Sequence, residues 1–373
     1  ATLKWLALAT VTLLIVLIAV ERTDRSDTVA GGEYLIPGLK ERINDITAIA
    51  VTGTGDTGSV NIARDGDGWQ VREKDGFPAD VGKLREILLA LADARKLEQK
   101  TANPERFAQL GLAGPEAGGG VLIEISGDEF RHGIIVGNAA QSKYRYVRMA
   151  EDNQSWLIDQ NPDLPADAAG WLASGLLDIE SARVRSVSIH HEDGETIRLE
   201  KASAEDTNYT VLDIPEGREL SYATVANGIA GVLKGLTLED ARRSSAGDLD
   251  ATSVFTTFDG LEITARLYQD GDNAWIALTA GTVAPVISPA ETPAAAEATG
   301  EETAGEQQDA GEVAIDDTTD AAADDAADAA DAPSTEEEAN SINARHAGWQ
   351  YRIPDYKSNL LGRRWADILQ AED

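Results

Sequence analysis

Short stretches of alternating apolar and polar residues, separated by Gly- and Asp-rich turns, dominate the chain after residue 45. A period of two predicts β-strands, and the first of them cover residues 46–51, 59–64 and 69–73. Residues 80–94 (DVGKLREILLALADA) instead repeat apolar positions at i, i+3, i+4 and i+7, which predicts an amphipathic helix. The opening pattern is therefore β-β-β-α.

Four more strands follow and predict a β-meander, after a short helix at residues 104–110. They are expected at residues 121–125, 129–136, 144–149 and 155–158. Residues 165–172 then favour a helical turn, which closes the first pattern.

The same order of patterns begins again after residue 183. Strands are predicted at residues 184–190, 196–201, 209–214, 254–258, 261–268, 275–279 and 349–353, and helices at 222–233 and 356–369. SWLIDQNPDLPADAAGWLASGLLDI and GWQYRIPDYKSNLLGRRWADIL share a Trp-bearing strand, a Pro and a helix with Trp and paired leucines. We therefore predict an α+β fold of tandemly duplicated β-rich halves, residues 45–180 and 183–370, each β-β-β-α followed by a β-meander with a helix.

One apolar run, within residues 3–20, differs from all the others in length. Its uncharged part begins at Trp5 and ends at Val20, and at about 1.5 Å per residue it covers roughly 24 Å. Snorkelling of Lys4 and an interfacial Trp5 extend this toward the ~30 Å hydrocarbon core. A cleaved signal peptide is the alternative, but no A-x-A-like site follows the run. We predict a single transmembrane helix within residues 1–22.

The charges that flank this run predict its orientation. Lys4 lies on the amino side, whereas the charges of residues 21–27 nearly cancel on the other side. This favours an inner (cytoplasmic) membrane protein with its N-terminus inside and its bulk extracytoplasmic, in the periplasm. Residues 23–44 are then expected to form a tether and a short helix.

Residues 285–341 interrupt the second half with Ala, Glu, Asp, Thr and Pro. Between residues 291 and 338 there are 17 Asp or Glu and no Lys or Arg, about half of the net charge of −33. Such a segment cannot bury enough apolar surface to offset its ordering entropy, so we predict a disordered acidic insert. A solvated loop and an arm that recruits a basic partner are the two interpretations of it.

The overall composition excludes several classes of function. The negative charge argues against binding to nucleic acid through a basic patch. The chain contains no cysteine, which excludes disulfides, thiolate metal sites and cysteine nucleophiles.

Four segments together resemble the domain of unknown function 4340 family: GLKERINDITAIAV, GWQVREKDGFPADVGKLREILLALADARKLEQKTANPERFAQLGL, SWLIDQNPDLPADAAGWLASGLLDI and RVRSVSIHHEDGETIRLEK. The resemblance spans most of residues 38–369, apart from the acidic insert. Members are typically single-anchor envelope proteins, and many are encoded beside an ABC-type ATPase, its permease and an auxiliary component of the gliding-motility type. The resemblance implies a transporter-associated role and supplies no catalytic residues.

Two motifs resemble binding loops. Gly53, Gly55 and Gly58 match G-x-G-x-x-G after a strand, but residues 59–64 alternate as a second strand where a dinucleotide fingerprint requires a helix. The Asp-rich turn after them resembles the start of a calcium loop, yet its twelfth position is Gly76, where that loop requires Glu. Both stretches therefore predict hairpin turns.

The four histidines, His132, His190, His191 and His346, include no pair with the i, i+4 spacing of a helical zinc site. His190 and His191 should point to opposite faces of one strand, where the neighbouring carboxylates would allow at most weak surface metal binding. No G-x-S-x-G elbow occurs. We therefore assign no catalytic, cofactor-binding or metal-binding residues and expect no enzyme activity.

Tryptophans at positions 69, 156, 275 and 349 fall at similar places in their strands, which favours a packed core over a row that stacks on sugars. We expect a membrane-anchored, non-catalytic extracytoplasmic accessory subunit of an ABC-type transport or envelope complex, with permease, ATPase and an auxiliary envelope protein as partners. A cell-wall or glycan-binding protein would show a clustered aromatic groove. An unrecognised envelope hydrolase would show converging carboxylates, or an Asp with a His.

Overall fold

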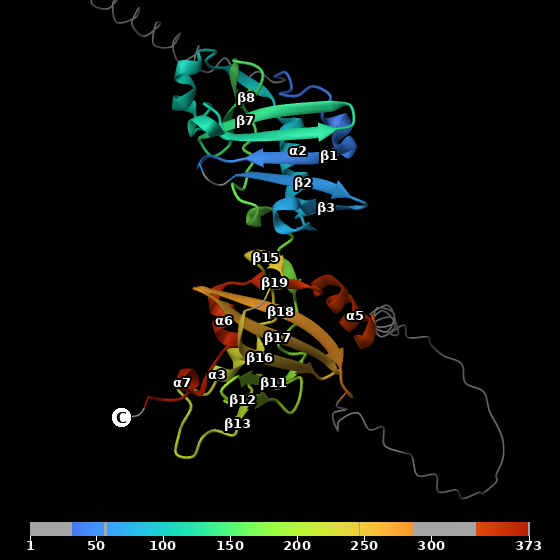
Figure 1. Ribbon diagram of the computed structural model, residues 1–373, viewed down its shortest axis with the longest axis vertical. Coiled ribbons are helices and arrows are strands. Elements are labelled where there is room, and N and C mark those ends of the chain that lie inside the picture. Colours follow the sequence, from blue (N-terminus) through green and yellow to red (C-terminus); the bar gives the residue numbers. More distant parts are fainter. Residues whose placement is uncertain (1–31, 56–57, 246, 286–332, 372–373) are drawn as a thin grey trace, which may run out of the picture. The chain divides into compact units, whose positions relative to one another are not determined.

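The computed structural model describes residues 32–55, 58–245, 247–285 and 333–371 (Figure 1). They divide into two compact units between Ser174 and Gly175. The predicted transmembrane helix at residues 1–22 lies outside the described residues. Among the helices of the described ranges, none is long and apolar enough to cross a membrane.

The first unit is built on a nine-stranded antiparallel sheet with the order β4-β3-β2-β1-β6-β7-β8-β9-β5. Its strands are β1 (Ile46–Thr52), β2 (Ser59–Asp65), β3 (Gly68–Val71), β4 (Phe77–Pro78), β5 (Lys96–Gln99), β6 (Val121–Gly127), β7 (Phe130–Ala140), β8 (Tyr144–Met149) and β9 (Ser155–Ile158). Its helices are η1 (Lys40–Asp45), η3 (Arg72–Lys74), α2 (Val81–Asp93), η4 (Pro104–Leu110), η5 (Pro115–Ala117) and η6 (Ala169–Trp171).

The second unit is built on an eight-stranded antiparallel sheet with the order β13-β12-β11-β16-β17-β18-β19-β15. Its strands are β11 (Val184–His191), β12 (Thr196–Glu200), β13 (Thr210–Leu212), β15 (Asp240–Arg243), β16 (Asp248–Thr257), β17 (Leu261–Asp270), β18 (Asn273–Thr282) and β19 (Trp349–Arg352). A separate ribbon pairs β10 (Gly175–Leu177) with β14 (Leu236–Thr237). The helices are α3 (Val225–Ala230), α5 (Thr335–His346), α6 (Asp355–Leu361) and α7 (Trp365–Ile368).

The two sheets have the same strand order once corresponding strands are matched. β1 to β3 correspond to β11 to β13, β6 to β9 correspond to β16 to β19, and β5 corresponds to β15 at the far edge. The helix before that edge strand is α2 in one unit and α3 in the other. β4 is an additional edge strand of the first sheet. The predicted α+β class is confirmed, and the strand order is the one that the predicted repeat requires.

The boundary between the units differs from the expected one. Residues 175–180 were predicted to end the first half, but β10 pairs with β14 and therefore belongs to the second unit. At the other end of the first unit, η1 confirms the short helix predicted within residues 23–44, and the chain just before it is packed. Leu35, Ile36 and Leu39 are buried, and the amide of Leu35 donates to the carbonyl of Ala94 at 2.8 Å.

The apolar period of residues 80–94 produces α2 as predicted. The side chain of Asp80 caps the helix by accepting from the amide of Lys83 at 3.0 Å. Leu84, Ile87 and Leu91 are buried on its inner face. Burial of such a stripe, at about 25 cal/mol per Å² of apolar area, holds an amphipathic helix against a sheet.

The expected disorder of residues 285–341 is wrong for residues 335–341, which begin helix α5. Ser334 and Glu337 form a capping box, and Ala339 is buried. Glu338 pairs with Arg183 at 2.6 Å. Glu336, Glu337 and Glu338 lie in the first turn of this helix, where their charge is favourable to the backbone dipole. Residues 286–332 of the predicted insert lie outside the described residues.

His346, the last residue of α5, is buried in the second unit. Its Nδ1 lies 2.8 Å from the hydroxyl of Tyr351, and the two rings meet edge to face with centroids 5.4 Å apart. Burial, with a further contribution from Arg345, lowers the pKa of His346 to about 4. The imidazole is therefore neutral at physiological pH.

Replacing His346 by Gln should flatten the pH dependence of the stability of the second unit. The pKa is about 4 in the folded protein and 6.5 ordinarily, so between these values the unfolded chain binds more protons. The unmodified protein should lose up to about 3 kcal/mol as pH falls through this window, and none above it. Urea unfolding at about pH 7 and about pH 5 measures the loss. His190→Gln, at an exposed position, is the control, and equal losses in both variants would contradict the assignment.

Candidate functional site: a groove beside α2

After β9 the chain turns back and runs along α2. This stretch, residues 159–172, is called the first return segment. At its start the amide of Arg95 donates to the Oδ1 of Asp159 at 2.8 Å. At its end the amide of Asp80 donates to the carbonyl of Trp171 at 2.8 Å, and Ala79 forms a β-bridge with Leu172. The segment is thus tied to the chain at both ends of α2.

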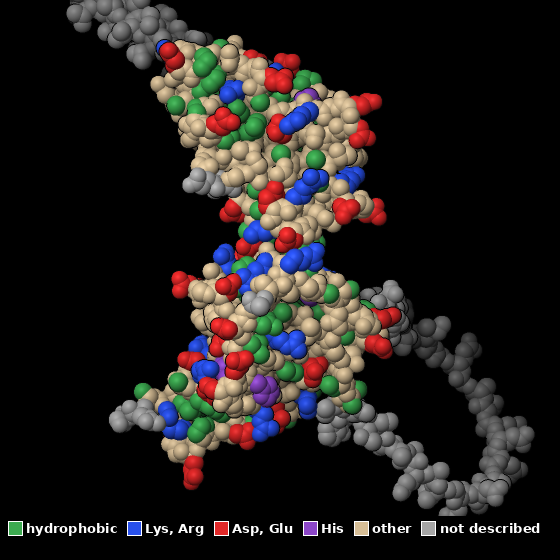
Figure 2. Space-filling view, in the orientation of Figure 1, with side chains coloured by type: hydrophobic (Ala, Val, Ile, Leu, Met, Phe, Trp, Pro, Cys, Tyr) green, Lys and Arg blue, Asp and Glu red, His purple; other side chains and the backbone are tan. Residues whose placement is uncertain are grey.

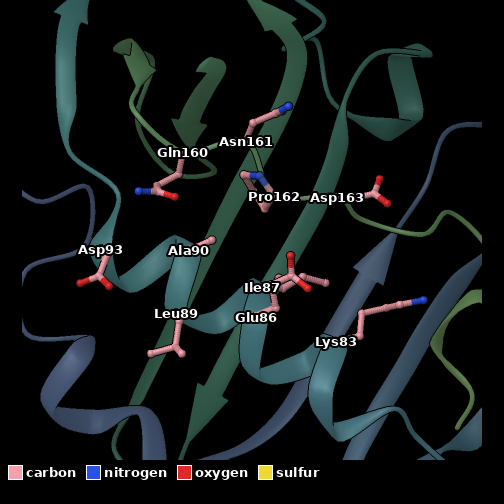
Figure 3. Close-up of a pocket in the computed structure, with 10 residues that line it drawn as sticks. All are labelled: Lys83, Glu86, Ile87, Leu89, Ala90, Asp93, Gln160, Asn161, Pro162 and Asp163. Carbon is pink, nitrogen blue, oxygen red and sulfur yellow. The ribbon is translucent and has the colours of Figure 1, made fainter. Parts of the chain in front are cut away.

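Between its two ties, the first return segment leaves a groove of about 480 Å³ against α2 (Figure 3). The groove is lined by Lys83, Glu86, Ile87, Leu89, Ala90 and Asp93 of α2 and by Gln160, Asn161, Pro162 and Asp163 of the return segment. In Figure 3 the helix forms one wall, and residues 160–163 form the wall opposite.

Two prolines explain why the first return segment is irregular. A helix begun at Pro162 would contain Pro165, which has no amide hydrogen and clashes with the preceding turn. The helical turn predicted over residues 165–172 shrinks to η6 (Ala169–Trp171). Trp171 is fully buried and donates from Nε1 to the carbonyl of Pro165 at 3.0 Å. The segment is therefore fixed in place without filling the space beside α2.

The groove has an apolar wall and an acidic rim. Leu89 of α2 is 39% exposed, which is high for a leucine in a folded unit. The rim carries the carboxylates of Glu86, Asp93 and Asp163. In the described part of the chain, no ion pair involves Glu86 or Asp163.

Three cations near the groove are engaged. The ammonium of Lys83 donates to the carbonyl of Gly170 at 2.5 Å. Lys40 pairs with Asp93 at 2.6 Å, and this hydrogen bond raises the pKa of the Lys40 ammonium. Arg145 donates to the carbonyl of Pro162 at 3.2 Å, and its charge interacts with the carboxylate of Asp163. Glu86 is therefore the carboxylate of the groove that is least compensated.

The second unit has a return segment of the same kind, residues 353–369. It ends on a β-bridge between Leu220 and Leu369, and the amide of Ser221 donates to the carbonyl of Ile368 at 2.8 Å. These ties repeat those made by Leu172 and Trp171 in the first unit. The second return segment differs in being helical, because its one proline, Pro354, stands at the N-cap of α6, where a missing amide hydrogen costs little.

Helix α6 contacts α3, which corresponds to α2. Its Lys357 is 6% exposed and donates from Nζ to the carbonyls of Val232 at 2.8 Å and Lys234 at 2.6 Å, just beyond the end of α3. Burial lowers the pKa of this ammonium. Leu360 of the same helix lies next to Gly228 of α3. The second unit thus places a buried lysine and a leucine, Leu360, of its own chain beside the helix that corresponds to α2.

The motifs singled out in the sequence lie elsewhere and are not brought together. Gly55 and Gly58, with φ of 74° and 70°, stand between the antiparallel strands β1 and β2, so the glycine motif forms the predicted hairpin. His190 is exposed, whereas His191 is buried and its Nε2 contacts the carbonyl of Arg363 at 3.0 Å. Within the described ranges, no group of three His, Asp or Glu is placed to hold a metal ion.

The four strand tryptophans each carry a cation over the ring, a pairing that the sequence did not predict. The four cations are Arg64 over Trp69, Lys96 over Trp156, Arg242 over Trp275 and Arg243 over Trp349, the last with 3.9 Å to the centroid. Trp275 and Trp349 are also buried, which is the predicted core role. On the face shown in Figure 2, acidic side chains lie on both units, so the negative charge is not confined to the acidic insert.

Comparison with known proteins bears on the family. Residues 69–253 match the model of a domain of unknown function, DUF4340, a range that includes α2, the first return segment and the first strands of the second unit. The chain belongs to this family. No curated protein and no solved structure matches the chain.

Replacing Lys83 by Met should loosen the first return segment. The change removes the hydrogen bond to the carbonyl of Gly170 and should lower the free energy of unfolding of the first unit by about 1–2 kcal/mol. Urea denaturation measures the loss. Arg85→Met, at an exposed position of the same helix, is the matched control and should change stability by less than about 0.5 kcal/mol. Equal effects of the two substitutions would show that Lys83 does not hold the segment.

Proposed function

We propose that this protein is a membrane-anchored, non-catalytic accessory subunit of an ABC-type transport or envelope complex, with its two units on the extracytoplasmic side. Membership of the DUF4340 family supports the proposal, because the members that the sequence resembles are typically single-anchor envelope proteins encoded beside such transporters. The anchor is the apolar run that ends at Val20. The permease, the ATPase and an auxiliary envelope protein are the proposed partners.

The observation that carries the proposal is the groove beside α2. The groove combines the exposed Leu89 with the carboxylates of Glu86 and Asp163, and we take this combination as the contact surface of another chain. An apolar wall and negative charge are features that a partner protein can recognise. A role in the assembly of a complex would use both of them.

We further propose that the two units arose by tandem duplication. The shared strand order and the two equivalent β-bridges, Ala79 with Leu172 and Leu220 with Leu369, support this. Duplication leaves one copy free to change. In this chain the first copy has the open groove, and the second has α6 in the corresponding place.

The two rival functions make different demands. A glycan-binding protein uses exposed aromatic faces, whereas Arg242 and Arg243 cover rings of Trp275 and Trp349 that are themselves buried. An envelope hydrolase requires converging carboxylates, which line the groove beside α2 and, as Asp250 and Asp367, a cavity of the second unit. Mutation of the pair that it uses would abolish turnover of an envelope substrate.

Purification of the full chain from its native membrane in mild detergent tests the proposal. An ATPase and a permease should be recovered with it in fixed proportion, because an accessory subunit is held by its complex. Recovery of the intact protein alone, combined with glycan binding or hydrolysis by the same preparation, would contradict the proposal and favour one of the rivals.

A further inference from the structure

We infer that the groove beside α2 receives a short amphipathic helix of a partner protein, with a lysine or arginine on the side that enters the groove. The inference rests on the proposed function, because it supplies the contact by which an accessory subunit would hold its complex. The partner's helix would carry one cation, with apolar side chains on either side of it on the same helical turn.

The second unit shows what fits beside this helix. Both return segments leave the last strand of the sheet and end on equivalent β-bridges. In the second unit α6 contacts α3, with Lys357 buried against the end of that helix and the side chain of Leu360 next to Gly228 of α3. In the first unit the corresponding stretch contains Pro162 and Pro165 and leaves a groove. The partner would supply the helix that these prolines prevent.

The charge of the groove favours a positively charged side chain on the partner. Glu86 and Asp163 face the groove from its two walls, while Lys83 is engaged by the carbonyl of Gly170. At the end of α2, Asp93 is already paired with Lys40. Glu86 and Asp163, which form no ion pair among the described residues, are the carboxylates that attract a Lys or Arg side chain.

Other segments of this chain fit less well. The acidic insert has the same sign as the rim, with 17 Asp or Glu between residues 291 and 338. The apolar run from Trp5 to Val20 offers no cation. The helix α6 of a second copy has the right chemistry, but its Lys357 and Leu361 are already buried in their own unit. A separate partner chain remains as the occupant.

Site-specific photo-crosslinking in the full chain, expressed in its native membrane, tests the inference. A photo-reactive residue at Leu89 should give one crosslinked protein, and the crosslink should map to a helical segment with a Lys or Arg within one turn. The same photo-reactive residue at Tyr222, 59% exposed in the second unit, should not give this product. Glu86→Lys should lower the yield about tenfold, because a like charge then faces the partner's cation.

Matched variants separate a lost contact from a lost fold. Glu151→Lys reverses an exposed carboxylate outside the groove and should leave the yield unchanged. Asp163→Lys reverses the opposite wall and should act as Glu86→Lys does, so the test stands even if one variant unfolds. Replacing the partner's cation by Glu should restore the crosslink in the Glu86→Lys chain.

Several outcomes would overturn the inference. The photo-reactive residue at Leu89 could give no crosslinked product, or a product with lipid, glycan or a second copy of this chain. The crosslink could map to a segment without Lys or Arg, or Glu86→Lys could leave the crosslinking yield unchanged. Failure of the proposed function looks different. If the crosslinked basic helix belongs to a protein other than the permease, ATPase or auxiliary component, the groove binds a helix as inferred, but the transporter role is wrong. If the transporter complex co-purifies but Leu89 gives no crosslinked product, the transporter role is supported and the inference about the groove is wrong.

Discussion

In both units, the chain that leaves the sheet's last strand in sequence, β9 or β19, returns along a helix and pairs with a residue that lies shortly before that helix in the chain. Leu172 meets Ala79 in the first unit, and Leu369 meets Leu220 in the second. This closure fixes both ends of the return segment, while the stretch between them is free to take different conformations. What lies beside the helix therefore depends on whether the local sequence between the two ties can form helix.

Proline decides that difference. Pro354 stands before α6 and leaves the residues after it free to form helix, so Lys357 and Leu360 pack beside α3. Pro165 would lie inside a helix begun at Pro162, and the first return segment is irregular up to the short helix η6, which contains Trp171. A helix interior tolerates proline only at a cost of about 3 kcal/mol. Pro165 thus bars a helix begun at Pro162, the position that corresponds to the start of α6.

Local patterns predicted most of the elements and few of the contacts. The alternation of residues 46–51 and 59–64, and the apolar stripe of α2, can be read from sequence because each depends on near neighbours. The groove could not be predicted, because Glu86 and Asp163 are far apart in sequence and line one groove only after the strands between them in the chain have formed the sheet. The start of α5 was missed because its glutamates are stabilised by a cap and by Arg183, which is distant in sequence.

If a partner helix binds in the first unit's groove, only that unit should change on binding, because α6 already occupies the corresponding place in the second unit. Amide hydrogen exchange of the full chain, measured alone and in the complex with which it co-purifies, tests this difference. Binding should slow exchange in α2 and in residues 160–163 and leave exchange in α3 and α6 unchanged. Slowed exchange in α3 and α6, with α2 unaffected, would contradict it.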